Sequence, residues 1–209
     1  MTNTVHRSEA HKGLAALLAM LAWVGPFSID AYLPSMPEIG RELGVGPLTV
    51  QQTLTAYMAP FAFMTLWHGA ISDALGRRRV ILAGVGLFAL ASLACALAGN
   101  IEWLLASRAL QGLTAGAGMV VGRAIIRDLL EGADAQRMMS QVTMVFALAP
   151  AVAPVLGGWL HVWFGWRSVF AFIVLFASAA LLMCVRGLPE TLPREKRQTM
   201  HPVYLLRSY

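Results

Sequence analysis

The chain has 209 residues, of which 57% are hydrophobic and 13% are charged, and its formal net charge is +5. A soluble domain carries about 25% charged residues, so this composition argues against a soluble protein and favours a chain that lies in lipid. The basic residues form no single patch or stripe along the sequence, which argues against nucleic-acid binding.

Six apolar stretches are each long enough to cross the hydrocarbon core of a membrane, which takes a helix of about 20 residues. The stretches are continuously apolar rather than alternating, so they predict helices and not the strands of a barrel. The predicted spans are Leu14–Leu33, Val50–Ile71, Val80–Ala98, Trp103–Gly122, Val142–Leu160 and Val169–Val185. Turn and charged residues fill the expected loops, Pro34–Pro47, Ser72–Arg79, Gly99–Glu102, Arg123–Gln141 and His161–Ser168.

The distribution of Lys and Arg predicts the orientation. Of the 16 basic residues, 13 lie in the amino terminus, in two of the loops and in the tail, all on one side of the predicted membrane. Two lie on the other side and Arg108 lies inside a span. Because cytoplasmic loops are rich in Lys and Arg, both termini are expected in the cytoplasm. We therefore predict a cytoplasmic segment 1–13, a six-helix bundle 14–185 and a cytoplasmic linker 186–209.

A short internal repeat predicts how the six helices are related. Residues 69–81 and 158–170 match at an offset of 89, and each copy lies between the second and third helix of a three-helix unit. The two units then have opposite orientations, which is a known construction of transporters. The identical pairs are Gly69 with Gly158, Gly76 with Gly165, Arg78 with Arg167, and Val80 with Val169.

The loop after the second span carries the most specific motif. Asp73 follows a helix C-terminus, where a carboxylate is unfavourable unless it is paired, so we expect a salt bridge to a nearby arginine or to another helix. The glycines of the loop should let neighbouring backbones approach closely. The loop resembles the signature cytoplasmic loop of the major facilitator superfamily, although Ala74 stands where that family usually has a basic residue. The resemblance assigns cytoplasmic gating to Gly69, Asp73, Gly76, Arg77 and Arg78.

Arg108 lies inside the fourth span, where an arginine costs about 2.5–3.5 kcal/mol at the helix centre on insertion scales. We expect it to have a partner, or else to extend its side chain to the outer surface. Asp30 is the expected partner, because counting 1.5 Å per residue places both in the outer third of the membrane. The alternative is that Asp30 is a helix-end residue in the external headgroup region. The pattern Arg108, Gln111, Gly112 resembles the fourth helix of the superfamily, whose arginine handles protons.

Three further segments resemble the Bcr/CflA group of drug resistance exporters within this superfamily: residues 28–37, 123–129 and 188–192. The resemblance implies an all-α membrane protein, with two inverted three-helix repeats forming one half of a twelve-helix fold. It implies exchange of protons for small amphipathic drugs across a bacterial inner membrane. With six helices rather than twelve, we expect the carboxy-terminal half to be missing and this half alone to be inactive. The alternative is a non-transporting interaction protein, or a subunit that pairs with a second six-helix chain.

The remaining candidates are weaker. The fifth span resembles the antiporter motif of the superfamily through Pro150, Pro154, Gly157 and Gly158, and a structural kink would explain these residues equally well. Gly112/Gly116 and Gly118/Gly122 are spaced for close helix contact. No nucleophile lies next to a base, so we expect no enzyme, and we expect no cofactor, metal or disulfide. Candidates for the substrate cavity, with simple packing as the alternative, are Tyr32, Tyr57 and Gln111.

Overall fold

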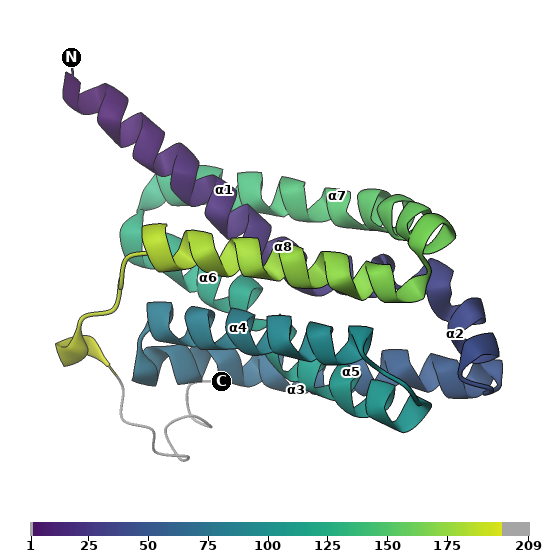
Figure 1. Ribbon diagram of the computed structural model, residues 1–209. Coiled ribbons are helices and arrows are strands. Elements are labelled where there is room, and N and C mark those ends of the chain that lie inside the picture. The colour runs from purple at the N-terminus through teal and green to yellow at the C-terminus, as the bar shows by residue number, and fades with distance from the viewer. Residues whose placement is uncertain (1, 198–209) are drawn as a thin grey trace.

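A computed structural model describes residues 2–197, and of residues 2–12 and 196 it describes the backbone alone. The described part contains helices and no strand (Figure 1). The helices are α1 (Thr2–Asp30), α2 (Met36–Glu42), α3 (Pro47–Leu75), α4 (Arg77–Ala96), α5 (Ile101–Ala115), α6 (Ala117–Leu129), α7 (Gly132–Phe164) and α8 (Trp166–Gly187), with 3₁₀ turns at Leu33–Ser35 and Arg194–Lys196. The last part of the predicted linker, residues 198–209, lies outside the described residues.

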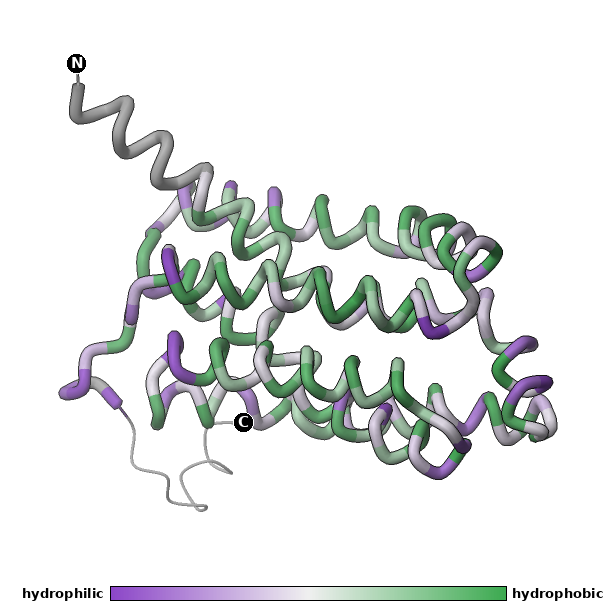
Figure 2. Tube along the Cα trace, in the orientation of Figure 1, coloured by the Kyte–Doolittle hydropathy of each residue, from purple (hydrophilic) through white to green (hydrophobic). Residues whose placement is uncertain are grey.

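Five helical segments of the described chain are long and apolar enough to cross a membrane. They are Gly13–Glu42, Arg77–Ala96, Ile101–Leu129, Gly132–Phe164 and Trp166–Gly187. The remaining predicted span, Val50–Ile71, corresponds to α3, which has 29 residues and packs mainly along α5. Its length is ample for the membrane, and its apolar run is interrupted by less apolar residues such as Pro60, Trp67 and His68. Figure 2 shows hydrophobic residues along the long helices and hydrophilic residues gathered at their ends.

The helices run further than the apolar stretches, so most of the predicted loops are shorter than expected. The predicted loop Arg123–Gln141 is helical except at Leu130 and Glu131. Hydropathy marks the part of a helix in hydrocarbon, whereas helical hydrogen bonding continues into the polar region. The predicted loop Pro34–Pro47 was also wrong in part, because it contains α2. An acid in the first turn of α2, Glu38, and a base in its last turn, Arg41, favour the helix dipole.

The bundle has two ends. The first, which we call the basic end, contains the α3–α4 and α6–α7 turns and the C-terminus of α8. The second, which we call the α2 end, contains α2 and the α4–α5 and α7–α8 turns. The α2 helix is fixed to the bundle by two acids. Glu38 Oε2 lies 3.1 Å from His161 Nε2, and Glu42 pairs with Arg167 while accepting a hydrogen bond of 2.6 Å from Trp166 Nε1.

The internal repeat is confirmed. Gly76 and Gly165 each form the single-residue break between two helices, with φ of 101° and 78°, in the region that favours glycine. The packing repeats as well: α3 of the first unit lies along α5 of the second, and α7 of the second lies along α1 of the first, so the two contacts between the units are equivalent. The predicted loops Ser72–Arg79 and His161–Ser168 are therefore tight glycine turns rather than extended connections.

The two repeated arginines cap opposite ends of one helix pair, α4 and α8, which pack along each other. Arg78 is the second residue of α4, and its Nε and Nη2 donate to the carbonyl oxygens of Leu188 and Val185, both at 2.8 Å, at the end of α8. Arg167 is the second residue of α8, and its Nη2 donates to the carbonyl oxygen of Ala98 at 3.0 Å, just past the end of α4. Each helix of the pair thus carries, in its first turn, an arginine that satisfies carbonyls at the end of the other.

Glycines allow the close helix contacts that their spacing predicted. A Cβ on Gly112 would overlap the backbone of Tyr57 in α3, and a Cβ on Gly118 would lie 2.6 Å from the carbonyl oxygen of Leu21 in α1. Gly116 stands between them at the point where α5 ends and α6 begins. The α5–α6 segment is therefore pressed against α1 and α3 along its length, and this places Arg108 of α5 in the middle of the bundle.

Candidate functional site

The centre of the candidate site is Arg108, whose side chain is fully buried. Its guanidinium carbon lies 4.4 Å from the ring centre of Tyr57 and 4.6 Å from that of Tyr32, so the cation stacks between two aromatic faces. Its Nη1 donates to Gln111 Oε1 at 2.7 Å. Aromatic faces attract a desolvated guanidinium with about 2 kcal/mol, which offsets part of the cost of burial. The alternative that Arg108 extends to the outer surface is wrong.

Hydrogen bonds hold the two tyrosines in place around this cation. Tyr57 Oη donates to the carbonyl oxygen of Gly25 at 2.9 Å and accepts from Ser28 Oγ at 3.0 Å. Tyr32 Oη shares a hydrogen bond of 2.7 Å with Thr53 Oγ1. The first set joins α1 to α3, and the second joins the turn after α1 to α3, so the aromatic walls of the site are fixed where the chain passes from the first long helix to the second.

The third wall comes from α4. Gln111 Nε2 donates to Ser92 Oγ at 2.8 Å, and Cys95 Sγ lies 3.9 Å from Gln111 Oε1. The side chains of Ser92 and Cys95 are fully buried. Ser28, Thr53 and Ser92 were not among the site residues predicted from the sequence. A usable signal was present for the first two, since Ser28 with Tyr32 and Thr53 with Tyr57 are spaced by four residues and therefore share one face of their helices.

The predicted ion pair between Asp30 and Arg108 is not formed. Among the described residues no carboxylate makes an ion pair with Arg108, and its Nε and Nη2 have no hydrogen-bond partner. The helical register explains the difference. Ser28 of α1 and Tyr32, two residues past the end of that helix, face the arginine, and the carbonyl oxygen of Ser28 lies 3.4 Å from Arg108 Nη1. Asp30 lies about 200° around the helix from Ser28, and as the last residue of α1 it is half-buried without a described partner.

The three candidates for the substrate cavity all surround Arg108. Tyr32, Tyr57 and Gln111 are fully buried between helices and lie on no exposed face. Their contact with a substrate stays a prediction.

A second polar cluster lies at the basic end and is built on Arg77, the first residue of α4. Arg77 Nη1 lies 2.5 Å from Asp73 Oδ1, and its Nε lies 3.0 Å from Asp128 Oδ2 of α6. Nη1 also donates to Ser72 Oγ at 2.6 Å. The predicted salt bridge of Asp73 to a nearby arginine is confirmed, and that arginine reaches across to another helix as well. We call Asp73, Arg77, Asp128 and Glu190 the gating cluster, after the role that the sequence resemblance assigns to Asp73 and Arg77.

Glu190 attaches the segment after α8 to this cluster. Its Oε1 accepts a hydrogen bond of 2.9 Å from the backbone N–H of Arg77, at the positive end of the α4 dipole. Its Oε2 lies 3.5 Å from Arg197 Nη2, and Thr191 Oγ1 donates to Asp128 Oδ2 at 2.9 Å. Sequence analysis singled out the motifs that contain Asp128 and Glu190, but it did not predict that both contact Arg77.

The glycines and prolines of the predicted motifs differ in how tightly they pack. At Gly69 an added Cβ would lie 3.9 Å from Val120, so the close approach predicted there is not present. Gly157 does pack closely, because a Cβ there would overlap the backbone of Ala31, the residue after the end of α1, whereas Gly158 has open space beside it. Pro150 and Pro154 lie inside a continuous α7, which changes direction toward its α8 end (Figure 1).

Comparisons with known proteins give a consistent result. The model of the Major Facilitator Superfamily matches residues 14–207. The chain is 44% identical over 186 residues to "Uncharacterized MFS-type transporter YdgK" of Bacillus subtilis, covering 88% of this chain and 46% of that protein. It is 35% identical over 192 residues to "Bicyclomycin resistance protein homolog" of Haemophilus influenzae, covering 92% and 48%. The crystal structure of the human organic anion transporter MFSD10 superposes with a TM-score of 0.72 at 24% identity, covering 90% and 50%, which supports the fold. The chain spans about half the length of the curated relatives it matches.

Proposed function

The chain belongs to the Major Facilitator Superfamily, and on this basis we propose that it is the amino-terminal half of a proton-coupled drug exporter. The proposal of drug export is supported by the Haemophilus influenzae relative, whose name records bicyclomycin resistance. The superfamily consists of transporters rather than enzymes. The comparisons therefore favour a transporter half over an interaction protein that does not transport.

We propose that the basic end faces the cytoplasm. Arg77, Arg78 and Arg79 lie there, together with Arg123 and Arg127 of α6, and basic residues concentrate on the cytoplasmic side of membrane proteins. The α2 end would then face outward. Residues 1–13 and 186–209 would flank the bundle on the cytoplasmic side.

The observation that carries the coupling proposal is the unpaired state of Arg108. A buried guanidinium with two unsatisfied nitrogens is costly, and Asp30 lies two residues from the carbonyl that Arg108 already approaches. We propose that a rotation at the end of α1 brings the ionised Asp30 to Arg108 in a second state. An arginine nearby favours the charged carboxylate, and its withdrawal favours the protonated acid. One proton would be bound and released in each cycle.

The gating cluster would close the cytoplasmic side during that cycle. Arg77 joins α3, α4 and α6, and Glu190 adds the segment after α8. Separating these elements breaks several charge-assisted hydrogen bonds at once, each stronger than a neutral one. Opening to the cytoplasm would therefore require a compensating change, such as substrate binding between this half and a second one.

The test is transport into liposomes by this chain joined to the carboxy-terminal half of a relative. A pH gradient should drive drug movement in the parent protein, and Asp30→Asn should remove the dependence on the gradient. Glu102→Gln is the matched control, since Glu102 is an exposed carboxylate at the same end of the bundle. Unchanged gradient dependence in Asp30→Asn would exclude Asp30 from coupling.

The same assay tests whether this half is active alone. The superfamily places substrate sites between two halves near the membrane midplane, so residues 1–209 alone would provide one wall of such a site. We expect liposomes with this chain alone to show no gradient-driven export. Export at the rate of the joined protein would refute the expectation.

A further inference from the structure

His68 of α3 is a buried ionisable residue that neither of the two sites described above uses. It is 5% exposed, and its Nδ1 is buried without a hydrogen bond, although the backbone of Met64, one turn earlier, lies within reach of the ring. In the described part of the chain His68 makes no ion pair. An ionisable side chain inside a transmembrane helix is costly, and it commonly marks a pathway for protons or substrate.

Contacts lead from His68 to Arg108. A Cβ on Gly116, where α5 ends and α6 begins, would lie 3.3 Å from His68 Nδ1 and 3.5 Å from the Phe61 ring. Phe61 stacks on Tyr57 with ring centres 6.1 Å apart, and Tyr57 is one of the two rings that hold Arg108. Packed side chains of α3 therefore link His68 to the Arg108 site.

The polar face of α3 continues past His68 to the gating cluster. This face carries Thr53, Tyr57, Thr65, His68 and Ser72. Counting 1.5 Å per residue along the helix, His68 lies about 16 Å beyond Tyr57 and about 6 Å before Ser72. Ser72 Oγ accepts the hydrogen bond from Arg77 described above. Of the residues on this face, only the imidazole titrates near neutral pH.

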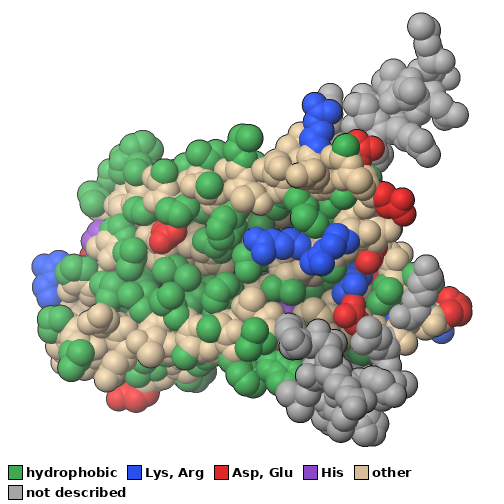
Figure 3. Space-filling view, turned by 180° about the vertical axis from the view of Figure 1, so that it is seen from behind, with side chains coloured by type: hydrophobic (Ala, Val, Ile, Leu, Met, Phe, Trp, Pro, Cys, Tyr) green, Lys and Arg blue, Asp and Glu red, His purple; other side chains and the backbone are tan. Residues whose placement is uncertain are grey.

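The charged groups of the helices around His68 lie elsewhere. The helices packed against α3 are α2, α4, α5 and α6. Arg108 lies at its own site, and Asp73 and Asp128 are paired with Arg77. The α2 end holds Glu38, Arg41, Glu42 and Glu102, and the others lie toward the basic end, namely Arg78, Arg79, Arg123 and Arg127. Figure 3 shows basic and acidic side chains gathered toward the basic end. A proton on His68 thus has no adjacent counter-charge, which suits a residue that passes protons on rather than one that retains them.

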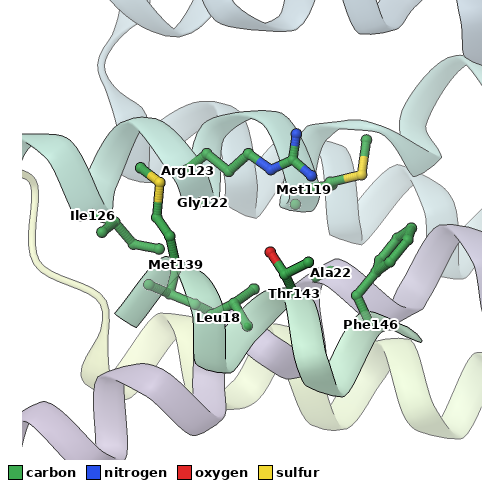
Figure 4. A pocket seen from close by; sticks show the side chains of 11 residues that line it. Leu18, Ala22, Met119, Gly122, Arg123, Ile126, Met139, Thr143 and Phe146 are labelled. Carbon is green, nitrogen blue, oxygen red and sulfur yellow. The ribbon is translucent and has the colours of Figure 1, made fainter. Parts of the chain in front are cut away.

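The packing of α6 leaves room for movement beside His68. A Cβ on Gly69, the next residue, would lie 3.9 Å from Val120 of α6, so the two helices are not in tight contact there. On a different side of α6, a cavity of about 40 Å³ lies between α1, α6 and α7 (Figure 4). A volume of this size holds about two water molecules. The interruption at Gly116 lets α6 tilt without bending α5.

We propose that His68 carries protons between the Arg108 site and the basic end. The inference rests on the proposed proton coupling and extends it by a second residue. When Asp30 releases its proton at Arg108, the carboxyl O–H bond breaks. Water that enters beside a tilted α6 delivers the proton to the imidazole, where an N–H bond forms. The imidazolium then releases one proton to water at the basic end and becomes neutral again.

The first test uses the joined protein in liposomes. Glutamine is polar but binds no proton near neutral pH, so His68→Gln should slow gradient-driven drug transport about ten-fold or more. Exchange of labelled for unlabelled drug without a gradient should be unchanged. His161→Gln is the matched control, since His161 Nδ1 is also buried without a hydrogen bond but lies on α7 at the α2 end, and both rates should be unchanged there. Unchanged gradient-driven transport in His68→Gln, or equal loss of both rates, would overturn the proposal.

The second test is independent of transport. A variant of residues 1–209 that keeps His68 alone of the five histidines is labelled with ¹⁵N in the imidazole ring and placed in nanodiscs. The ring signals should move reversibly between neutral and charged values between about pH 5 and pH 8 while the protein stays folded. A ring that stays neutral throughout would exclude His68 as a proton carrier. Absence of gradient-driven transport in the parent protein would refute the proposed coupling instead, and the ring titration would still decide whether His68 binds a proton.

Discussion

Arg77 and Arg79 are two residues apart in one run of arginines, yet the structure predicts opposite consequences for their loss. The Arg77 side chain is 10% exposed and contacts Asp73 and Asp128, which are 32% and 21% exposed. Removing one partner of a buried ion pair costs about 3–5 kcal/mol, because the charge left behind has lost its compensation. Partial exposure lets water reach both carboxylates and reduces this cost. We expect Arg77→Gln to lower the free energy of unfolding by about 2–3 kcal/mol.

Arg79 is exposed and makes no side-chain hydrogen bond or ion pair in the described part of the chain. Arg79→Gln should therefore change the free energy of unfolding by less than about 0.5 kcal/mol. The assay is unfolding in mixed micelles with increasing dodecyl sulfate, followed by tryptophan fluorescence. A double-mutant cycle of Arg77→Gln with Asp128→Asn should give a coupling energy of about 1 kcal/mol or more. Equal effects of the Arg77 and Arg79 substitutions would refute the assignment of Arg77 as the centre of the gating cluster.

Three further predictions use the same unfolding assay. Gly157→Ala should destabilise by about 1–3 kcal/mol because its Cβ overlaps the backbone of Ala31, just past the end of α1, whereas the adjacent Gly158→Ala should be neutral or stabilise by up to about 1 kcal/mol; equal effects would contradict the packing of α7 against Ala31. Gly76→Ala should cost about 1–3 kcal/mol, because its φ of 101° strains any other residue; an unchanged midpoint would contradict the turn. Arg78→Gln and Arg167→Gln should each cost about 1 kcal/mol through the lost helix caps, and an effect of only one would contradict the repeat.

Much of the fold could be predicted from the sequence, because a segment that crosses a membrane as a helix must be long and continuously apolar. Six long apolar stretches predicted six helices, and four identical pairs at one offset predicted the inverted repeat. The helix ends could not be predicted from hydropathy, since helices continue into polar surroundings. The helix α2 was missed for the same reason. It lies among charged and turn residues at the end of the first span.

The depth of Asp30 and Arg108 in the membrane could be predicted from the sequence, but the direction in which each side chain points could not. Counting residues along the helices placed Asp30 and Arg108 at one level, and the rotation of each side chain about its helix was not considered. Ser28 and Tyr32 share the face that meets Arg108, and Asp30 does not. Arg77 shows a related limit, since nothing in a run of three arginines tells which one is buried. Arg77 is the arginine that pairs with Asp128, and the position of Asp128 depends on how α6 packs beside α4.

The reciprocal arginine caps have a consequence for movement within the bundle. Hydrogen bonds at both ends of this antiparallel pair resist sliding and separation of the two helices, so α4 and α8 form a rigid pair. In the described chain neither of these helices contains an interior proline. Each of the other long segments has a point where its helical ladder is interrupted: Pro26 in α1, Pro60 in α3, Gly116 between α5 and α6, and Pro150 with Pro154 in α7. Bending of the bundle would then be confined to the interruptions in these four segments, while the α4–α8 pair keeps its shape.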